Sequence, residues 1–127
     1  MSKILVVDDS KLIRAQVRSV LEGLHHEIAG EASSGKDAVK KYKELKPDLV
    51  IMDVIMPHGN GIEATKMIMA LDEAAKVLLM STDHQAWRVT EAVIAGGKGY
   101  ITKPFTEQEL IAKISEMLNS EVDNATS

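Results

Sequence analysis

The sequence predicts an α/β fold in which a parallel β-sheet carries helices on both faces. Short apolar runs alternate five times with longer segments whose apolar residues recur at helical spacing. Such alternation is typical of a parallel sheet with crossover helices. The central run, Leu49 to Asp53, is apolar until it closes on a lone carboxylate, as expected for a strand buried on both faces. Right-handed crossovers would bring the carboxyl ends of all the strands to one edge of the sheet.

Five strands are expected, each followed by a turn or by polar residues. Besides the central run, they are Ile4–Val7, Glu27–Ala32, Val77–Ser81 and Gly99–Thr102. The segment from Pro57 to Gly61, after the central strand, is expected to be a loop because it is rich in proline, glycine and asparagine.

Five helices are expected between and after the strands, each with an apolar stripe. The first helix is expected to bury Ile13, Val17, Leu21 and Leu24, and the second to run from Lys36 to Lys46. The third is expected to bury Ile62, Thr65, Ile68 and Leu71. The fourth is expected to run from Gln85 to Ala95 with Val89, Ala92 and Val93 on its apolar face, and the fifth to bury Leu110, Ile114 and Leu118. Asn60 with Glu63, and Thr106 with Glu109, have the spacing of capping boxes. We expect one domain over residues 1–120 and a short disordered tail over residues 121–127, which are small and polar.

Composition narrows the class of protein. The chain has 127 residues, enough for one domain, and its net charge of −4 argues against a dedicated nucleic-acid binder. It has no cysteine, which excludes disulfides and thiolate metal sites. No apolar run approaches the roughly 20 residues of a membrane span, and the start runs directly into a strand without the pattern of a signal peptide. We therefore expect a cytoplasmic monomer.

Polar side chains gather at the predicted carboxyl edge. Asp8 and Asp9 follow the first strand, Asp53 closes the third, Ser81 the fourth, and Lys103 follows the fifth. Three carboxylates in one cleft would raise one another's pKa unless a cation lies among them, and Mg²⁺ suits carboxylates that also meet phosphate oxygens. A carboxylate can itself attack phosphorus, while a lysine and a hydroxyl stabilise the transferring group. The pattern predicts a phosphoryl group accepted on Asp53.

These residues stand in motifs that resemble the receiver domain of two-component response regulators, most closely the stand-alone CheY-like kind. The matching stretches are Val6-Val7-Asp8-Asp9-Ser10, Met52-Asp53-Val54-Ile55-Met56-Pro57, Asn60-Gly61, Leu79-Met80-Ser81 and Gly99-Tyr100-Ile101-Thr102-Lys103-Pro104-Phe105. The resemblance covers about residues 3 to 119. It implies a flavodoxin-like receiver fold with strand order 2-1-3-4-5.

The resemblance also implies a role for each matching residue. Asp53 would be the phosphoacceptor. Asp8, Asp9, Asp53 and the backbone carbonyl of Ile55 would hold Mg²⁺. Ser81 and Lys103 would bind the phosphoryl oxygens, Tyr100 would change rotamer with Ser81, and the Lys103–Pro104 bond would be cis.

The implied function is that of a single-domain response regulator, a phosphoprotein that assists its own phosphorylation and dephosphorylation and is not an enzyme in the usual sense. The implied partners are a histidine kinase as phosphodonor, a downstream target such as a motor switch component in chemotaxis, and a phosphatase. No nucleic-acid or membrane partner is expected. An alternative is the receiver half of a larger regulator, or an intermediate of a phosphorelay.

Three positions depart from the common pattern of the family. Gly59 and Asn60 stand where many members have a bulkier residue and an aspartate. Thr82 stands where alanine or glycine is common, and we expect its bulk to obstruct the water that hydrolyses the phosphorylated form. Ile55 and Asp83 also occupy positions that tune this lifetime in the family.

The same residues allow other interpretations. Asp9 and Ser10 could simply cap the first helix. Taken alone, Ser81 is an ordinary hydroxyl at a strand end and Tyr100 a half-buried strand aromatic.

Three rival functions compete with that of a receiver domain. A nucleotide or flavin binder would need a loop of Gly, Ser or Thr after the first strand, where Asp8 and Asp9 would repel phosphate. A Mg²⁺-dependent phosphohydrolase would need a general acid or base near Asp53, and no second carboxylate follows closely. The complete set of site residues argues against a binding module that keeps only the fold.

Overall fold

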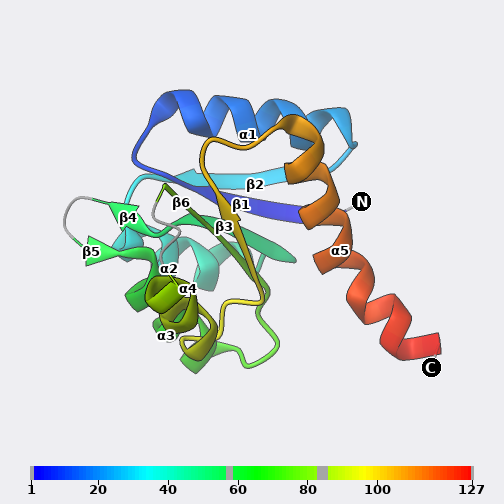
Figure 1. The fold of residues 1–127 in the computed structure, drawn as a ribbon. Helices are drawn as coiled ribbons and strands as arrows, with labels where there is room; N and C mark the ends of the chain where they lie inside the picture. Colours follow the sequence, from blue (N-terminus) through cyan, green and yellow to red (C-terminus); the bar gives the residue numbers. More distant parts are fainter. Residues whose placement is uncertain (1, 57–58, 83–85, 127) are drawn as a thin grey trace.

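A five-stranded parallel sheet lies between two layers of helices in the computed structural model, which describes residues 2–56, 59–82 and 86–126, with side chains over 2–56, 61–82 and 90–118 (Figure 1). The sheet strands are β1 Lys3–Val7, β2 Glu27–Ala32, β3 Leu49–Asp53, β6 Val77–Ser81 and β7 Gly99–Thr102. The helices are α1 Lys11–Gly23, α2 Gly35–Leu45, α3 Gly61–Leu71, α4 Ala86–Ile94 and α5 Glu107–Thr126. The spatial order β2-β1-β3-β6-β7 confirms the expected flavodoxin-like order, with every pairing parallel.

The two helical layers follow from the alternation of side chains along each buried strand. In β1, Leu5 and Val7 face the core under α2, α3 and α4, whereas Ile4 and Val6 face the core under α1 and α5. All four side chains are fully buried, as expected for a strand covered on both faces. Figure 1 shows α1 and the start of α5 above the sheet and the other three helices below it.

Side-chain caps fix where three helices begin. The hydroxyl of Ser10 accepts a hydrogen bond from the Ile13 N–H at 3.3 Å, and that of Ser34 accepts one from the Asp37 N–H at 3.1 Å. At α5 the predicted capping box is confirmed. The Glu109 N–H donates to Thr106 Oγ1 at 3.1 Å, and the Thr106 N–H donates to Glu109 Oε1 at 3.2 Å.

Two residues expected in apolar stripes are exposed instead. Leu71 is 49% exposed because successive residues of a helix are about 100° apart around its axis. Leu71 follows buried Ile62 by nine residues, which places the two side chains on opposite sides of the helix. Val93 is 63% exposed because it follows buried Ala92 directly and points about 100° away from it. The side chain of Val89 lies outside the described residues.

The segment after β3 contains structure that the sequence did not predict. Ile55–Met56 (β4) and Gly59–Asn60 (β5) form a short antiparallel pair. Gly59 and Asn60 were expected in a loop, and the other loop residues Pro57 and His58 lie outside the described residues. α3 begins at Gly61, while the Asn60 side chain, and with it the expected Asn60–Glu63 cap, lies outside the described residues.

At the other end of the chain, α5 continues to Thr126, so residues 121–126 are helical here and not the disordered tail we expected. The physical reason is that no glycine or proline interrupts the chain after Pro104. The division of the chain at residue 120 remains a prediction. Over the part of the chain that is described, no helix is both long and apolar enough to cross a membrane.

Candidate functional site

Three carboxylates meet where β1 and β3 end. Asp53 closes β3, and Asp8 and Asp9 follow β1 directly. Because the two strands are parallel neighbours, with Val7 opposite Met52, the residues that follow them emerge side by side. One carboxylate oxygen from each aspartate lies within 4.8 Å of the others. Asp8 is fully buried and Asp53 is 4% exposed, whereas Asp9 is exposed, so the acidic cluster opens to solvent at Asp9.

Lys103 joins two of these carboxylates. Its Nζ lies 2.7 Å from Asp8 Oδ2 and 3.3 Å from Asp53 Oδ1. Its backbone N–H donates to the carbonyl of Ser81 at 2.8 Å, which ties the turn after β7 to the end of β6. The following Lys103–Pro104 bond is cis, as the resemblance implied. Lys103 therefore reaches the cluster from the turn after β7, which lies two strands away from β3 in the sheet.

Burial and the neighbouring charges shift the pKa of the Asp53 carboxyl. Burial raises the pKa of the Asp53 carboxyl to about 6, and the negative charge of Asp8 acts in the same direction. The ammonium of Lys103 opposes this rise, as does the Ile55 N–H, which donates to Asp53 Oδ1 at 3.4 Å. Asp53 is therefore mostly ionised at pH 7, in surroundings that would favour a further cation.

The donor set fits a hard divalent cation. The three aspartates supply only oxygen, and against their three negative charges the single ammonium of Lys103 leaves a net deficit of positive charge. Mg²⁺ prefers oxygen ligands and is commonly bound by one or two carboxylates together with water and phosphate oxygens. The carboxylates of Asp8, Asp9 and Asp53 are the side chains that would hold it; a contribution from the carbonyl of Ile55 remains a prediction.

Ser81 and Tyr100 lie on the two neighbouring strands. Ser81 is fully buried and ends β6, one residue beyond Met80, which is paired with Asp53. Tyr100 lies within β7 opposite Leu79 and packs, partly buried, against the core under α2, α3 and α4. Ser81 is thus placed at the edge that carries the cluster, whereas Tyr100 lies further back along its strand.

The positions expected to tune the lifetime of the phosphorylated form are only partly described. Thr82, which follows Ser81, is exposed, and the Ile55 side chain is 51% exposed. Asp83 and the side chain of Asn60 lie outside the described residues.

Gly61 belongs to the site, although the sequence analysis gave it no role. A Cβ on Gly61 would lie 2.1 Å from the carbonyl oxygen of Asp53, so only glycine allows this close backbone approach. Its N–H also donates to the carbonyl of Val54 at 2.7 Å. The Asn60-Gly61 dipeptide was a visible turn signal in the sequence. That signal does not show which backbone group Gly61 approaches, so the contact with Asp53 could not be inferred from it.

Arg14 is the second residue that was missed. It lies on α1, and its Nη1 donates to the backbone carbonyl of Asp8 at 2.5 Å. Its position one turn after the cap residue Ser10 was the available signal, because a residue four positions on lies over the helix start. An arginine thus touches the acidic cluster through the backbone.

The comparisons with known proteins identify the class. A family model described as "Response regulator receiver domain" matches residues 4–115, and the chain belongs to this family. The chain is 42% identical over 115 residues to the chemotaxis protein CheY of Thermotoga maritima, covering 91% of this chain and 96% of that protein. It is 43% identical over 118 residues to Protein CcdB of Bacillus subtilis, covering 93% of this chain and 98% of that protein.

A solved structure extends the likeness. The crystal structure of the CheX-CheY-BeF3-Mg²⁺ complex from Borrelia burgdorferi matches with a TM-score of 0.87 and 29% identity, over 90% of this chain and 87% of that one.

Proposed function

We propose that the chain is a single-domain response regulator that accepts a phosphoryl group on Asp53 from the phosphohistidine of a histidine kinase. The observation that carries this proposal is the position of Lys103, whose ammonium pairs with both Asp8 and Asp53 at the carboxyl edge of the sheet. Mg²⁺, held by the carboxylates of Asp8, Asp9 and Asp53 and the carbonyl of Ile55, would neutralise charge on the phosphoryl oxygens.

The proposed reaction is a simple displacement at phosphorus. A carboxylate oxygen of Asp53 attacks in line, an O–P bond forms, and the P–N bond of the phosphohistidine breaks. The imidazole nitrogen keeps the electron pair of the broken bond. Lys103 pairs with the new phosphoryl oxygens, and the hydroxyl of Ser81 donates to one of them. Burial of Asp53 at the closed end of the cluster limits the access of water to the product.

The output is proposed to be a protein contact in chemotaxis. Support comes from CheY relatives that match over most of their own length, and from the CheX-CheY complex among the structural matches. Movement of Ser81 toward the phosphoryl group and a rotamer change of Tyr100 would shift the surface around β7 between two populations. A motor switch component is the proposed downstream target, a phosphatase is the further partner, and the cytoplasm is the proposed location.

Intact-mass measurement after incubation with Mg²⁺ and acetyl phosphate tests the proposal. The native chain should gain one phosphoryl group, and the gain should disappear with EDTA or in Asp53→Asn. Asp48→Asn is the matched control, because Asp48 directly precedes the same strand at its opposite end, where it accepts a hydrogen bond from the Lys3 N–H. An adduct that persists in Asp53→Asn would overturn the assignment of the acceptor. Turnover of a phosphate ester in large excess over protein would instead favour a phosphohydrolase.

A further inference from the structure

Asp8 is held from four directions. Its N–H donates to the carbonyl of Ala32 at 3.1 Å, and its carbonyl accepts from Arg14. Its carboxylate accepts from the Ser10 N–H at Oδ1, at 2.9 Å, and from Lys103 at Oδ2. The last two contacts use the oxygens that would bind a cation. The two backbone contacts do not involve the carboxylate oxygens, so they can hold Asp8 in place whether or not a cation is bound.

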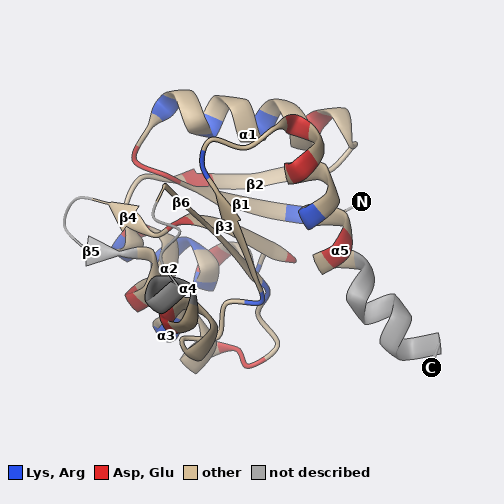
Figure 2. Cartoon of the chain, viewed as in Figure 1, with Lys and Arg blue, Asp and Glu red and all other residues tan. Residues whose placement is uncertain are grey.

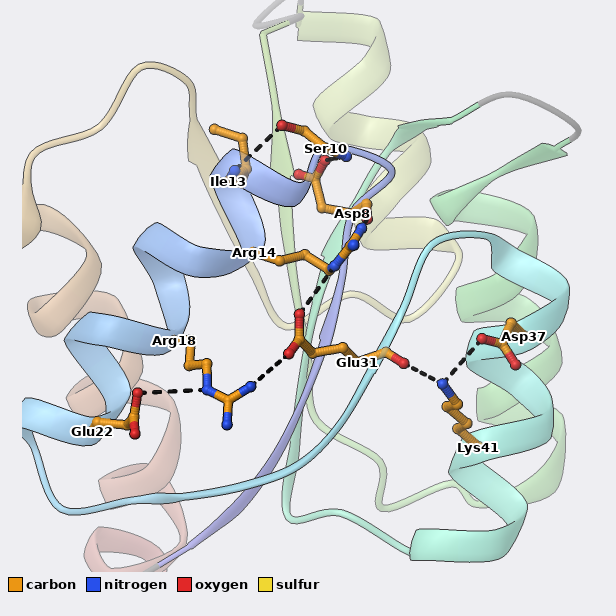
Figure 3. A network of polar contacts seen from close by, with 9 residues as sticks. All are labelled: Asp8, Ser10, Ile13, Arg14, Arg18, Glu22, Glu31, Asp37 and Lys41. Carbon is orange, nitrogen blue, oxygen red and sulfur yellow. Dashed lines mark hydrogen bonds and ion pairs between the residues drawn. The ribbon is translucent and has the colours of Figure 1, made fainter.

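Arg14 is itself held by an acidic partner on β2. Its Nε donates to Glu31 Oε1 at 3.0 Å while its Nη1 reaches Asp8, and its side chain is only 14% exposed (Figure 3). The guanidinium is planar and presents its donors in a fixed fork, so one side chain can join these two acceptors in a single orientation. A lysine has one nitrogen and cannot reproduce this fork.

Glu31 is in turn fixed by two further cations. Arg18, one turn along α1, donates to Glu31 Oε2 at 2.8 Å and is 49% exposed. Lys41 of α2 donates to the backbone carbonyl of Glu31 and pairs with Asp37 at 3.2 Å. Figure 2 shows the acidic positions at the end of β2 and in the turn before α1, with basic positions of α1 close by. The network therefore spans α1, β2 and α2 and ends on Asp8.

We propose that Arg14 is a positioning residue for the metal site, with Glu31 holding Arg14 against the backbone of Asp8. This inference rests on the proposed function, because it concerns Mg²⁺ binding by the acidic cluster. Loss of an outer partner of a metal ligand weakens metal binding about 10- to 100-fold, and Arg14 acts less directly, through the backbone carbonyl of Asp8. We therefore expect a loss of about tenfold in affinity.

Electrostatics alone predicts the opposite result. A guanidinium near a cation site repels the cation, so replacing Arg14 by a neutral residue would then tighten Mg²⁺ binding. Arg14→Lys would keep the charge and leave the affinity unchanged. The positioning role instead predicts weaker binding for both Arg14→Met and Arg14→Lys, which makes the two explanations separable by sign.

The experiment measures the Mg²⁺ dissociation constant of the full chain by calorimetric titration at pH 7.5. The variants are Arg14→Met, Arg14→Lys and Glu31→Gln, with Arg18→Met as the matched control. Arg18 shares the acceptor Glu31 and the charge of Arg14 but contacts Glu31 and Glu22 rather than Asp8. Urea unfolding in EDTA confirms that each variant is folded, and the more conservative Arg14→Lys and Glu31→Gln keep the test open if Arg14→Met does not fold.

We expect the dissociation constant to rise about tenfold in both Arg14 variants and to change less than about twofold in Arg18→Met. Glu31→Gln should weaken binding in the native background and have no further effect in Arg14→Met, since Glu31 acts through Arg14. Phosphorylation by acetyl phosphate should need more Mg²⁺ for half its maximal rate in the Arg14 variants, while saturating Mg²⁺ restores the native rate.

Unchanged or tighter Mg²⁺ binding in both Arg14 variants, or an equal loss in Arg18→Met, would overturn the positioning role and leave the proposed function intact. Failure of the native chain to bind Mg²⁺ would overturn both, whereas Mg²⁺ binding without formation of an adduct would overturn the proposed function alone.

Discussion

Replacing Asp53 by asparagine should make the metal-free protein more stable. The raised pKa of Asp53 means that the folded state holds its ionised form at a cost. Asparagine has nearly the same shape and no charge, so it removes that cost. The same change removes the proposed phosphoacceptor, so stability and function should move in opposite directions.

The magnitude follows from the two pKa values. The folded chain has a pKa of about 6 at Asp53 against a reference value of 3.8. Between these values the folded state binds more protons than the unfolded chain, so stability falls as the pH rises through the window. At 1.36 kcal/mol for each pH unit, the full cost above about pH 7 is about 3 kcal/mol, and at pH 5 it is about half of that.

Urea unfolding at pH 5 and pH 8, in EDTA, checks this prediction. Asp53→Asn should raise the free energy of unfolding by up to about 3 kcal/mol at pH 8 and by about half as much at pH 5. Asp48→Asn, at the other end of the same strand, should show no such gain, because Asp48 is exposed and the carbonyl oxygen of asparagine can still accept the hydrogen bond from the Lys3 N–H. Addition of Mg²⁺ should stabilise the native chain more than Asp53→Asn, since a ligand stabilises the state that binds it.

The reasoning would be refuted if Asp53→Asn were less stable than the native chain at pH 8. It would equally be refuted if the gain were the same at both pH values, because the stabilisation would then not come from removing an ionised carboxylate.

Three further predictions concern the same edge of the sheet. Lys103→Met should raise the pKa of Asp53 above about 6, since its ammonium lowers that pKa. It should slow adduct formation with acetyl phosphate at pH 7 by about tenfold or more; a native rate measured by intact mass would contradict this. Gly61→Ala should cost about 2–3 kcal/mol in urea unfolding, because its Cβ would overlap the carbonyl oxygen of Asp53; a loss below about 0.5 kcal/mol would show that the backbone can move apart. Thr82→Ala should shorten the lifetime of the phosphorylated form, followed as loss of the adduct after the donor is removed, and an unchanged or slower decay would exclude shielding by Thr82.

The sequence predicted the layered arrangement of the main sheet and its helices. Strands buried on both faces are written as uninterrupted apolar runs, and their alternation with helices predicts a parallel sheet. Parallel topology then gathers the residues that follow the strands at one edge, so the sequence was enough to group Asp8, Asp9, Asp53 and Lys103, which the structure brings together. The strand order came from the family resemblance, and the sheet confirms it.

Helix faces were less predictable. Ile62 and Ile68 are buried as expected, but Leu71 and Val93 are exposed. A list of apolar residues does not fix how far around the helix the contact with the sheet extends. That angle depends on how each helix is seated, which is a property of the packed molecule.

The tertiary structure decided the electrostatics of the site. Residue types showed that carboxylates and a lysine would meet, but not that Asp8 and Asp53 are buried while Asp9 is exposed, and burial is what raises the pKa of Asp53. The contacts of Arg14 and Gly61 with the backbone of the two buried aspartates were also invisible in the sequence. Sequence periodicity specifies which side chains face a common edge, whereas distances, burial and backbone contacts arise only when the elements pack together.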